Sequence, residues 1–261
     1  MRALVTNDDG ISSPGLATLV AVAQEAGYDV TVAAPAAEAS GSGTSLVGVE
    51  HGGRLRVERR PAPGVADDVP SFAVHATPAL IAFLAAYEGF GPRPHVVLSG
   101  VNRGANTGHA VLHSGTVGAA LSAMTLGIHG LAVSIDSPDP QHWATAGVVA
   151  AHGLRWLVGR DAADGVLNVN VPDRPAHALR GVRAATLAPF GAVQASVRAD
   201  DGGDLVVRYR AADGEATPGS DAGQLADGWA TLTLLRAPCA DGSVVLPEVL
   251  DGPLHATSPE L

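Results

Sequence analysis

The sequence predicts an α/β fold: a Rossmann-like, mostly parallel sheet with helices on both faces, followed by a β-rich C-terminal hairpin extension. Three observations lead to this prediction. Short apolar runs alternate with helix-like segments through the first half of the chain. The runs are almost entirely apolar, which is typical of strands covered on both faces. The chain is also long enough, at 261 residues with 46% apolar side chains, to bury a large core.

The individual elements follow from spacing and from the residues that end them. The run 29–35 stops at Pro35, which cannot continue a sheet ladder as a donor. The helix predicted at 78–89 opens with Pro78, a favourable residue for the first helical position. The predicted strands are 2–6, 29–35, 71–76, 95–100, 130–135 and 166–172, and the predicted helices are 15–27, 78–89, 116–127 and 142–159.

The pattern changes near residue 180, where strand-like runs no longer alternate with helices. We therefore divide the chain into an α/β catalytic core, 1–179, and a β-rich extension, 180–261, which serves in oligomerisation and ends in a tail. Within the extension, the runs 182–189 and 205–212 are expected to pair as a hairpin across the turn-rich segment 199–204, and 228–235 adds another strand.

Charge and cysteine content exclude several classes of protein. The formal net charge of −10 argues against a groove for a nucleic-acid polymer, which needs a basic surface. The single cysteine, Cys239, excludes an intramolecular disulfide and a thiolate metal site. Asp8 and Asp9 interrupt any signal-peptide pattern, and no apolar run reaches the roughly 18–20 residues that span a bilayer. We expect a cytoplasmic protein without a membrane partner.

Two adjacent carboxylates, Asp8 and Asp9, directly follow the first predicted strand. One interpretation is that either residue caps the helix that begins near Gly15. The other is a cation site, because hard cations such as Mg²⁺ prefer carboxylate oxygens. Ligands of parallel α/β sheets bind beyond the C-terminal strand ends, where these aspartates are expected to lie.

A serine-rich loop follows the second predicted strand, in the segment 34–47. Its composition fits a flexible surface loop. It also fits a binding loop, because hydroxyl groups can ligate a metal or bind phosphate oxygens. The hydroxyl residues in question are Ser40, Ser42, Thr44 and Ser45.

The segment 99–120 holds five glycines and two asparagines between an apolar strand and an apolar helix. Loops this long and rich in glycine are uncommon in compact domains without a function. Ser114, Gly115 and Thr116 fall at the start of the helix, where backbone N–H groups favour an anion. A carboxylate pair and an anion site at one edge of the sheet indicate metal-assisted phosphoryl transfer.

Taken in order, these segments resemble the SurE (survival protein E) family of metal-dependent 5′/3′-nucleotidases, of which this chain would be a divergent member. The resemblance covers roughly residues 1–235. It rests on the ordered set LVTNDDG, AP with a Ser-rich loop, TPA, SGVNRGANTG followed by SGTVGAA, LNVNVP and TPGSDAGQLADGWATLTLL.

The resemblance implies a divalent metal ion, Mg²⁺ or Mn²⁺, and a small phosphomonoester substrate. It implies homodimers or homotetramers in which C-terminal hairpins are exchanged between subunits, in line with the hairpin predicted above. The implied metal ligands are Asp8, Asp9, Ser40 and Asn102, and the implied phosphate site is Asn106 with Ser114, Gly115 and Thr116.

The catalytic assignment is Asp8, Asp9 and His113. The sequence leaves open whether Asp8 attacks phosphorus or only holds the metal. His109 and His113 lie in the glycine-rich loop, where an imidazole can bind phosphate or protonate a leaving alkoxide. Asp221 either reaches the site through the late motif or has a structural role. The remaining histidines weighed, His51, His142, His152 and His255, fit surface or helix-face positions.

The chain departs from the family pattern beside the phosphate site. Leu80 stands where an acid is usual in GTPAD, and Ala110 and His113 replace the aspartate and tyrosine of DVLYSGT. Ala36 and Ala39 replace the aspartate and arginine of the serine loop. We expect hydrolysis of nucleoside monophosphates or a related phosphomonoester. The alternatives are a phosphatase for one pathway intermediate, such as a sugar phosphate or modified nucleotide, and a non-catalytic protein that binds nucleotides or phosphometabolites.

Overall fold

The structure of the chain is a computed structural model. It describes residues 1–48, 50–189, 193–200, 202, 204–211 and 217–240. Within these residues, no helix is both long and apolar enough to cross a membrane.

In the described part of the chain, nine strands form one sheet in the order β10-β13-β9-β8-β7-β1-β2-β6-β5. The six strands from β9 to β6 run parallel, whereas β13 and β5 pair antiparallel with their inner neighbours. The strands are β10 (Val182–Ala184), β13 (Ala230–Leu235), β9 (Val166–Val171), β8 (His129–Ile135), β7 (Val96–Arg103), β1 (Arg2–Thr6), β2 (Asp29–Pro35), β6 (Ser71–Val74) and β5 (Val57–Arg59).

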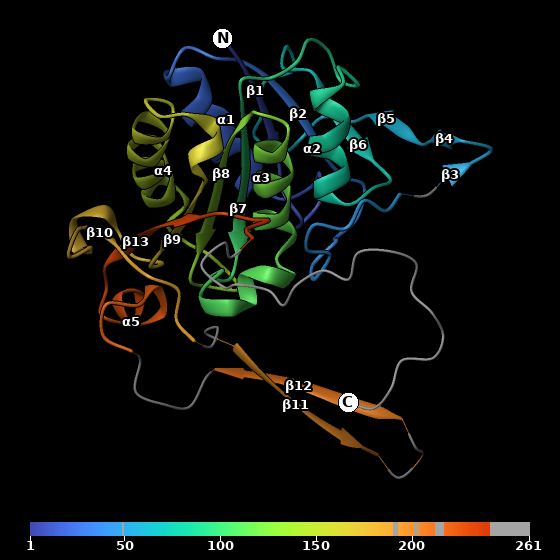
Figure 1. Cartoon of the computed structure of the whole chain (residues 1–261). Coiled ribbons are helices and arrows are strands. Elements are labelled where there is room, and N and C mark those ends of the chain that lie inside the picture. Colours follow the sequence, from blue (N-terminus) through green and yellow to red (C-terminus); the bar gives the residue numbers. More distant parts are fainter. Residues whose placement is uncertain (49, 190–192, 201, 203, 212–216, 241–261) are drawn as a thin grey trace, which may run out of the picture.

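Helices cover both faces of this sheet (Figure 1). Helices α1 (Gly15–Glu25) and α4 (Trp143–Leu157) pack on one face, and α2 (Pro78–Ala86) and α3 (Gly115–Thr125) pack on the other. Successive strand residues supply the two cores in alternation, so Val5 packs with the α1 and α4 side and Leu4 with the α2 side. The α/β fold and its helices on both faces are therefore confirmed.

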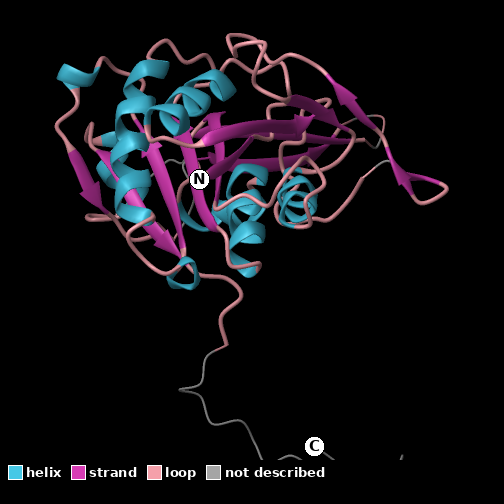
Figure 2. Cartoon of the chain, turned by 90° about the horizontal axis from the view of Figure 1, so that it is seen from above, coloured by secondary structure: helices cyan, strands magenta, loops and turns pink. Residues whose placement is uncertain are grey.

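Smaller elements complete the described chain. Two hairpins stand apart from the main sheet, one formed by β3 and β4 and one by β11 and β12 (Figures 1 and 2). The remaining elements are β3 (Glu50–His51), β4 (Arg54–Leu55), β11 (Val193–Ala199), β12 (Leu205–Ala211), α5 (Asp221–Ala226) and the short 3₁₀ helices η1 (Gly108–His113), η2 (Ala162–Asp164) and η3 (Ala176–Ala178).

The C-terminal hairpin is formed by a different first strand than the sequence predicts. The segment 205–212 was expected to pair with 182–189, but β12 pairs with β11 across the turn-rich segment between them. Residues Val182–Ala184 instead form β10, which runs parallel to β13 at one edge of the main sheet. Both runs are apolar enough for a strand, and the nearer one forms the hairpin because it needs only a short loop. The predicted tail lies outside the described residues.

The parallel strands β1, β2, β7, β8 and β9 all end at the same edge of the sheet. Figure 1 shows the arrowheads of β7 and β8 pointing to the end opposite the N-terminus. Asp8 and the serine-rich loop follow two of these strands, and Asn102 lies in the last residues of a third, β7. The topology thus gathers residues that are far apart in sequence along one edge.

Candidate active site

The turn after β1 presents two aspartates at this edge of the sheet. Asn7 closes the turn, because its Nδ2 donates to the Gly10 carbonyl at 3.0 Å and its Oδ1 accepts from the Gly10 N–H at 3.1 Å. Gly10 has a φ of +94°, a left-handed conformation that glycine adopts at little cost. The local sequence therefore fixes Asp8 and Asp9 at the end of a buried strand.

Asp8 is only 4% exposed, and both of its carboxylate oxygens meet the start of α3. The Thr116 N–H donates to Oδ2 at 3.0 Å, and the Thr116 hydroxyl donates to Oδ1 at 2.5 Å. Burial raises the pKa of Asp8 to about 6; the hydrogen bonds from Thr116 oppose this rise and the charge of Asp9 adds to it. An ionised carboxylate in this position would be stabilised by a nearby cation.

Asp9 pairs with a cation supplied by β7. The Arg103 N–H donates to its Oδ2 and Arg103 Nε donates to its Oδ1, both at 3.3 Å. Burial raises the pKa of Asp9, although the Arg103 guanidinium acts in the opposite direction. At 3.3 Å these bonds are long for a charged pair, so the Asp9 carboxylate keeps capacity for a closer cation.

The serine-rich loop is tied to the aspartate turn through its backbone. The Ala39 N–H donates to the Asp8 carbonyl at 2.8 Å. Ser40, the predicted ligand, is exposed, and its hydroxyl donates to Glu38 Oε1 at 2.8 Å. Ser42 differs, because its Oγ is buried and has no hydrogen-bond partner among the described residues. The structure thus holds a second loop hydroxyl whose hydrogen-bonding capacity is unused by the described residues.

Gly115 explains how this loop and the aspartate turn approach α3 so closely. A Cβ atom at Gly115 would lie 2.6 Å from Ser42 Oγ and 2.8 Å from Asp8 Cβ. Any larger residue would push Asp8 and Ser42 away from the start of the helix. Ser114 caps the same helix, since its Oγ accepts from the Val117 N–H at 3.1 Å.

The two asparagines of the glycine-rich segment are held differently. Asn102 is the next-to-last residue of β7, and its Nδ2 donates to the Gly104 carbonyl at 2.7 Å, which leaves the amide oxygen for a further ligand. Asn106 is anchored to β8 and β9. Its N–H donates to Asn170 Oδ1 at 2.7 Å, and its carbonyl accepts from Nδ2 of Asn168 and of Asn170 at 2.8 and 2.9 Å.

The predicted histidines lie on η1, between Asn106 and the start of α3. His109 and His113 are both exposed. The His113 carbonyl accepts from the Gly43 N–H at 3.1 Å, so η1 and the serine-rich loop are in contact. The structure brings these residues to the same edge as Asp8, but no hydrogen bond joins either imidazole to another described side chain.

Asp221, whose role the sequence leaves open, is a structural anchor for this loop. It is fully buried and accepts backbone hydrogen bonds from Gly108 and Ala188, both at 2.9 Å, and from Ala222 at 2.8 Å. Helix α5 thereby holds the start of η1 in place. A carboxylate satisfied by three N–H donors has little capacity for a substrate.

Sequence reasoning missed three contacts of this site: the Arg103 pair with Asp9, the Asn168 and Asn170 anchor, and the bonds from Thr116 to Asp8. The asparagine anchor had a local signal. Two polar residues at positions i and i+2 place both amides on one face of an otherwise apolar strand, β9. The other two contacts join residues about a hundred positions apart and have no local pattern.

The oxygen-rich character of the site fits a hard divalent cation. Asp8, Asp9 and Asn102 supply carboxylate and amide oxygens, and the orphaned Ser42 hydroxyl adds another oxygen nearby. Within the described residues, no three His, Cys, Asp or Glu side chains gather at one point, so a site built for Zn²⁺ from such residues is not seen.

Comparison with known proteins agrees with this geometry. The family model described as Survival protein SurE matches residues 3–191. The chain belongs to the SurE family. It is also similar to the crystal structure of the SurE protein from Aquifex aeolicus, with a TM-score of 0.76 and 25% sequence identity over 93% of this chain and 96% of that one. The predicted family is thus confirmed.

SurE proteins are nucleotidases and phosphatases, and the family is generally metal-dependent. Membership therefore places this chain among hydrolases. The residues that carry the activity, the metal it uses and its preferred substrate are the subject of the proposal below.

Proposed function

We propose that this SurE protein is a divalent-metal-dependent phosphomonoesterase that acts on nucleoside monophosphates or a related small phosphomonoester. The observation that carries the proposal is the pair Asp8 and Asp9, two buried adjacent carboxylates at the C-terminal end of the central strand β1. Burying two like charges is costly unless a cation compensates them. Arg103 offsets only Asp9, and from an exposed side chain.

Asp8, Asp9, Ser40 and Asn102 would hold the metal, all through oxygen atoms. The Ser40 hydroxyl donates its hydrogen to Glu38, which leaves the lone pairs of its oxygen for a cation. A bound Mg²⁺ or Mn²⁺ supplies polarisation of a phosphoryl oxygen and a lowered pKa for a water molecule. Thr116 fixes the rotamer of Asp8, so that the carboxylate is oriented before any ligand arrives.

The start of α3 would bind the phosphoryl group. Ser114, Gly115 and Thr116 lie in its first turn, where the helix carries partial positive charge. The Thr116 donors are used by Asp8, which leaves the Gly115 N–H and the Ser42 hydroxyl for phosphoryl oxygens. Asn106 is fixed by its three backbone contacts and by its Nδ2, which donates to Ser134 Oγ at 2.8 Å, so only its amide oxygen would be left for a ligand.

His113 or His109 would protonate the leaving alkoxide. Both imidazoles are exposed on η1, next to the proposed phosphate site. An imidazole beside a leaving group can act as a general acid and donate a proton to the leaving alkoxide. Their exposure also leaves them free to turn toward a bound substrate.

The substitution Asp8→Asn tests the proposal. Release of phosphate from p-nitrophenyl phosphate with Mn²⁺ should be abolished, and Mn²⁺ binding by calorimetry should weaken by about tenfold or more, because a charged ligand becomes a neutral amide. The matched control is Asp164→Asn, which removes an exposed carboxylate paired with Arg160 and should leave activity unchanged. Full phosphatase activity in Asp8→Asn would contradict the proposal.

A second candidate, a phosphatase for one pathway intermediate, is favoured by the departures from the family pattern. Ala110 is exposed on η1, directly between the two histidines in the loop. Leu80 lies in the first turn of α2, beside the loop at Gly48. Neither side chain can accept a hydrogen bond from a ribose hydroxyl, as a carboxylate would, and each lost partner removes about 1–3 kcal/mol of discrimination.

We therefore expect weak preference among ordinary nucleoside monophosphates and better turnover of another phosphomonoester. The measurement is kcat/KM with Mn²⁺ or Mg²⁺ across 5′- and 3′-nucleotides, sugar phosphates and polyphosphate. A sharp preference for one common nucleoside monophosphate over every sugar phosphate would show that the departures are neutral. Metal binding without phosphate release from any substrate would instead favour the non-catalytic binding protein.

A further inference from the structure

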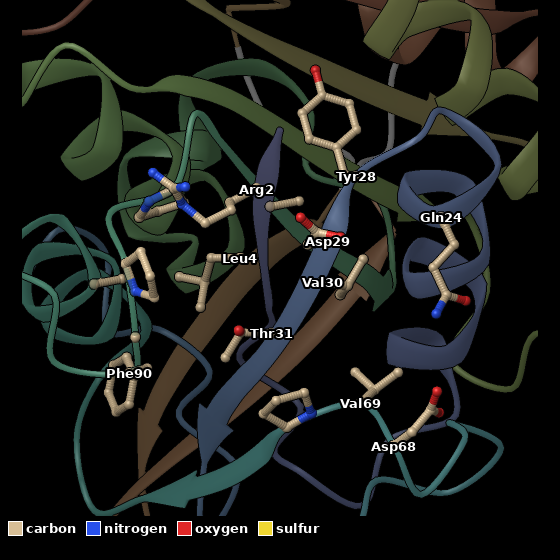
Figure 3. A pocket seen from close by; sticks show the side chains of 16 residues that line it. Arg2, Leu4, Gln24, Tyr28, Asp29, Val30, Thr31, Asp68, Val69 and Phe90 are labelled. Atoms are coloured by element: carbon tan, nitrogen blue, oxygen red, sulfur yellow. The ribbon is translucent and has the colours of Figure 1, made fainter.

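A cavity of about 370 Å³ lies at the other end of the sheet, where β1 and β2 begin (Figure 3). It is formed by the first residues of these two strands, the end of α1, the segment 68–70 and the segment 90–94. Asp8 follows the opposite end of β1. This cavity is therefore separate from the proposed phosphatase site, and its volume falls in the range of small-molecule sites.

The floor of the cavity is an uncovered strand edge. Strand β6 begins only at Ser71, opposite Val32, and the Val32 N–H donates to the Pro70 carbonyl at 2.8 Å. Continuing this parallel ladder by two residues would pair the Val30 carbonyl with the nitrogen of Pro70. Proline has no N–H to donate, so the ladder stops there.

Val30 consequently presents a free donor and a free acceptor. The Asp29 N–H donates to the Met1 carbonyl at 2.8 Å, so Asp29 faces β1 and the N–H and C=O of Val30 face the opposite edge. No backbone or side-chain hydrogen bond to Val30 on that edge is found among the residues described. A buried backbone donor and acceptor normally have partners, which marks this edge as a place for a ligand with complementary groups.

The walls beside this edge suit a flat ring. Leu4 and Phe90 lie on one side of β2, and Val69 lies on the other, as seen in Figure 3. The Thr31 side chain lies between these two walls (Figure 3). An adjacent donor and acceptor on a strand edge, flanked by apolar walls, match the hydrogen-bonding edge of a planar lactam or amidine heterocycle.

The charges around the cavity disfavour a phosphate. Asp29 and Asp68 line it, both are exposed, and neither forms an ion pair with a described cation. Arg2 is the one basic residue in the described lining, and its Nε donates to the Arg93 carbonyl at 3.0 Å, which holds the guanidinium to one side. A neutral ligand avoids the repulsion that two carboxylates would exert on a phosphate.

We propose that this cavity is a second binding site, for the uncharged heterocyclic base of a nucleoside or free nucleobase. The Val30 N–H and C=O would pair with the edge of the base, and its faces would pack against the apolar walls. The site would reject the corresponding monophosphate. The proposal does not depend on phosphatase activity, because none of the residues involved belongs to the edge that holds Asp8.

The test is calorimetric titration of the full chain in EDTA with adenosine, uridine, adenine and uracil, and with AMP and UMP. We expect saturable binding of at least one base, as the free base, the nucleoside or both. The substitution Thr31→Tyr fills the cavity with a residue that strands accept, and should weaken this binding by about tenfold or more. Val57→Tyr, at an exposed position of the edge strand β5, is the control and should leave it unchanged.

A charge variant keeps the test decisive if Thr31→Tyr fails to fold. Asp68→Asn should strengthen binding of AMP or UMP by several-fold, whereas Asp67→Asn, at the neighbouring exposed residue outside the cavity, should not. The proposal is overturned if no base or nucleoside binds, if folded Thr31→Tyr binds as the wild type does, or if Asp67→Asn and Asp68→Asn have the same effect.

Discussion

Asp8 belongs to the proposed site, and its burial lowers the stability of the metal-free fold. Its carboxyl lies in the protein interior beside a second carboxylate, and Thr116 supplies two hydrogen bonds that hold it there. Those bonds lower the cost of ionisation without removing it, since the pKa still rises to about 6. Without a metal, the ionised form therefore opposes folding at neutral pH.

This imbalance predicts a pH-dependent stability for the metal-free protein. The pKa of Asp8 rises from its ordinary value of 3.8 to about 6 in the fold. The stability that the protonated carboxyl contributes is therefore fully present below pH 3.8 and is lost as pH rises through about 6. This difference between the two pKa values corresponds to roughly 3 kcal/mol in the free energy of unfolding. In urea unfolding with EDTA between pH 4 and 7.5, the free energy of unfolding of Asp8→Asn should increase relative to that of the wild type as pH rises. Parallel profiles would contradict this assignment.

At the scale of elements, the site depends on how closely α3 approaches the serine-rich loop. Gly118 lies in the second turn of α3, and a Cβ there would be 1.9 Å from the Gly43 carbonyl oxygen. Gly43 in turn donates to the His113 carbonyl, so the loop, the helix and η1 are packed as one unit. Backbone contacts of this kind leave no room for a side chain.

Gly118→Ala should therefore destabilise the fold and displace the loop. Alanine ordinarily favours a helix over glycine by about 1 kcal/mol, so a loss of stability here would isolate the steric effect. The control is Gly147→Ala in α4, where the nearest atom to an added Cβ is the Thr18 methyl at 3.2 Å, a side chain that can shift. The measurements are thermal unfolding and Mn²⁺ affinity of both variants, and Gly118→Ala should lose more of each than Gly147→Ala. Equal effects would argue against the close approach.

At the scale of the whole molecule, the β11–β12 hairpin is the feature that indicates contact with another chain. Among the strands that the structure describes, β11 and β12 pair only with each other, and the hairpin projects away from the main sheet (Figure 1). An isolated two-stranded hairpin is marginally stable in water, so contacts with another chain would be needed to stabilise it. We propose that the extension mediates a homodimer or homotetramer.

Light scattering coupled to size exclusion should give a dimer or tetramer at micromolar concentration. Replacing residues 193–211 by a short Gly-Ser linker should give a monomer that keeps its far-UV circular dichroism, because the main sheet does not include these strands. A control linker replacing residues 50–55, the β3–β4 hairpin, should leave the assembly intact. A monomeric wild type would count decisively against the proposal.

Much of this protein was determined locally by its sequence. The alternation of apolar runs with helical spacing gave the core elements to within a few residues, because burial of one helical stripe or one strand is a property of neighbouring residues. The order of motifs identified the family. The position of Asp8 and Asp9 also followed directly, since parallel strands all end at one edge of the sheet.

Other features were decided only by the tertiary structure. The segment 182–184 and the strand β11 are both plausible partners for β12, and only the three-dimensional arrangement places one in the main sheet and the other in the hairpin. The bonds from Thr116 to Asp8 and from Arg103 to Asp9 join residues about a hundred positions apart. The close approach of Ser42 to Gly115 likewise joins two segments that are distant in the sequence. Such contacts depend on packing between elements, and no local periodicity encodes them.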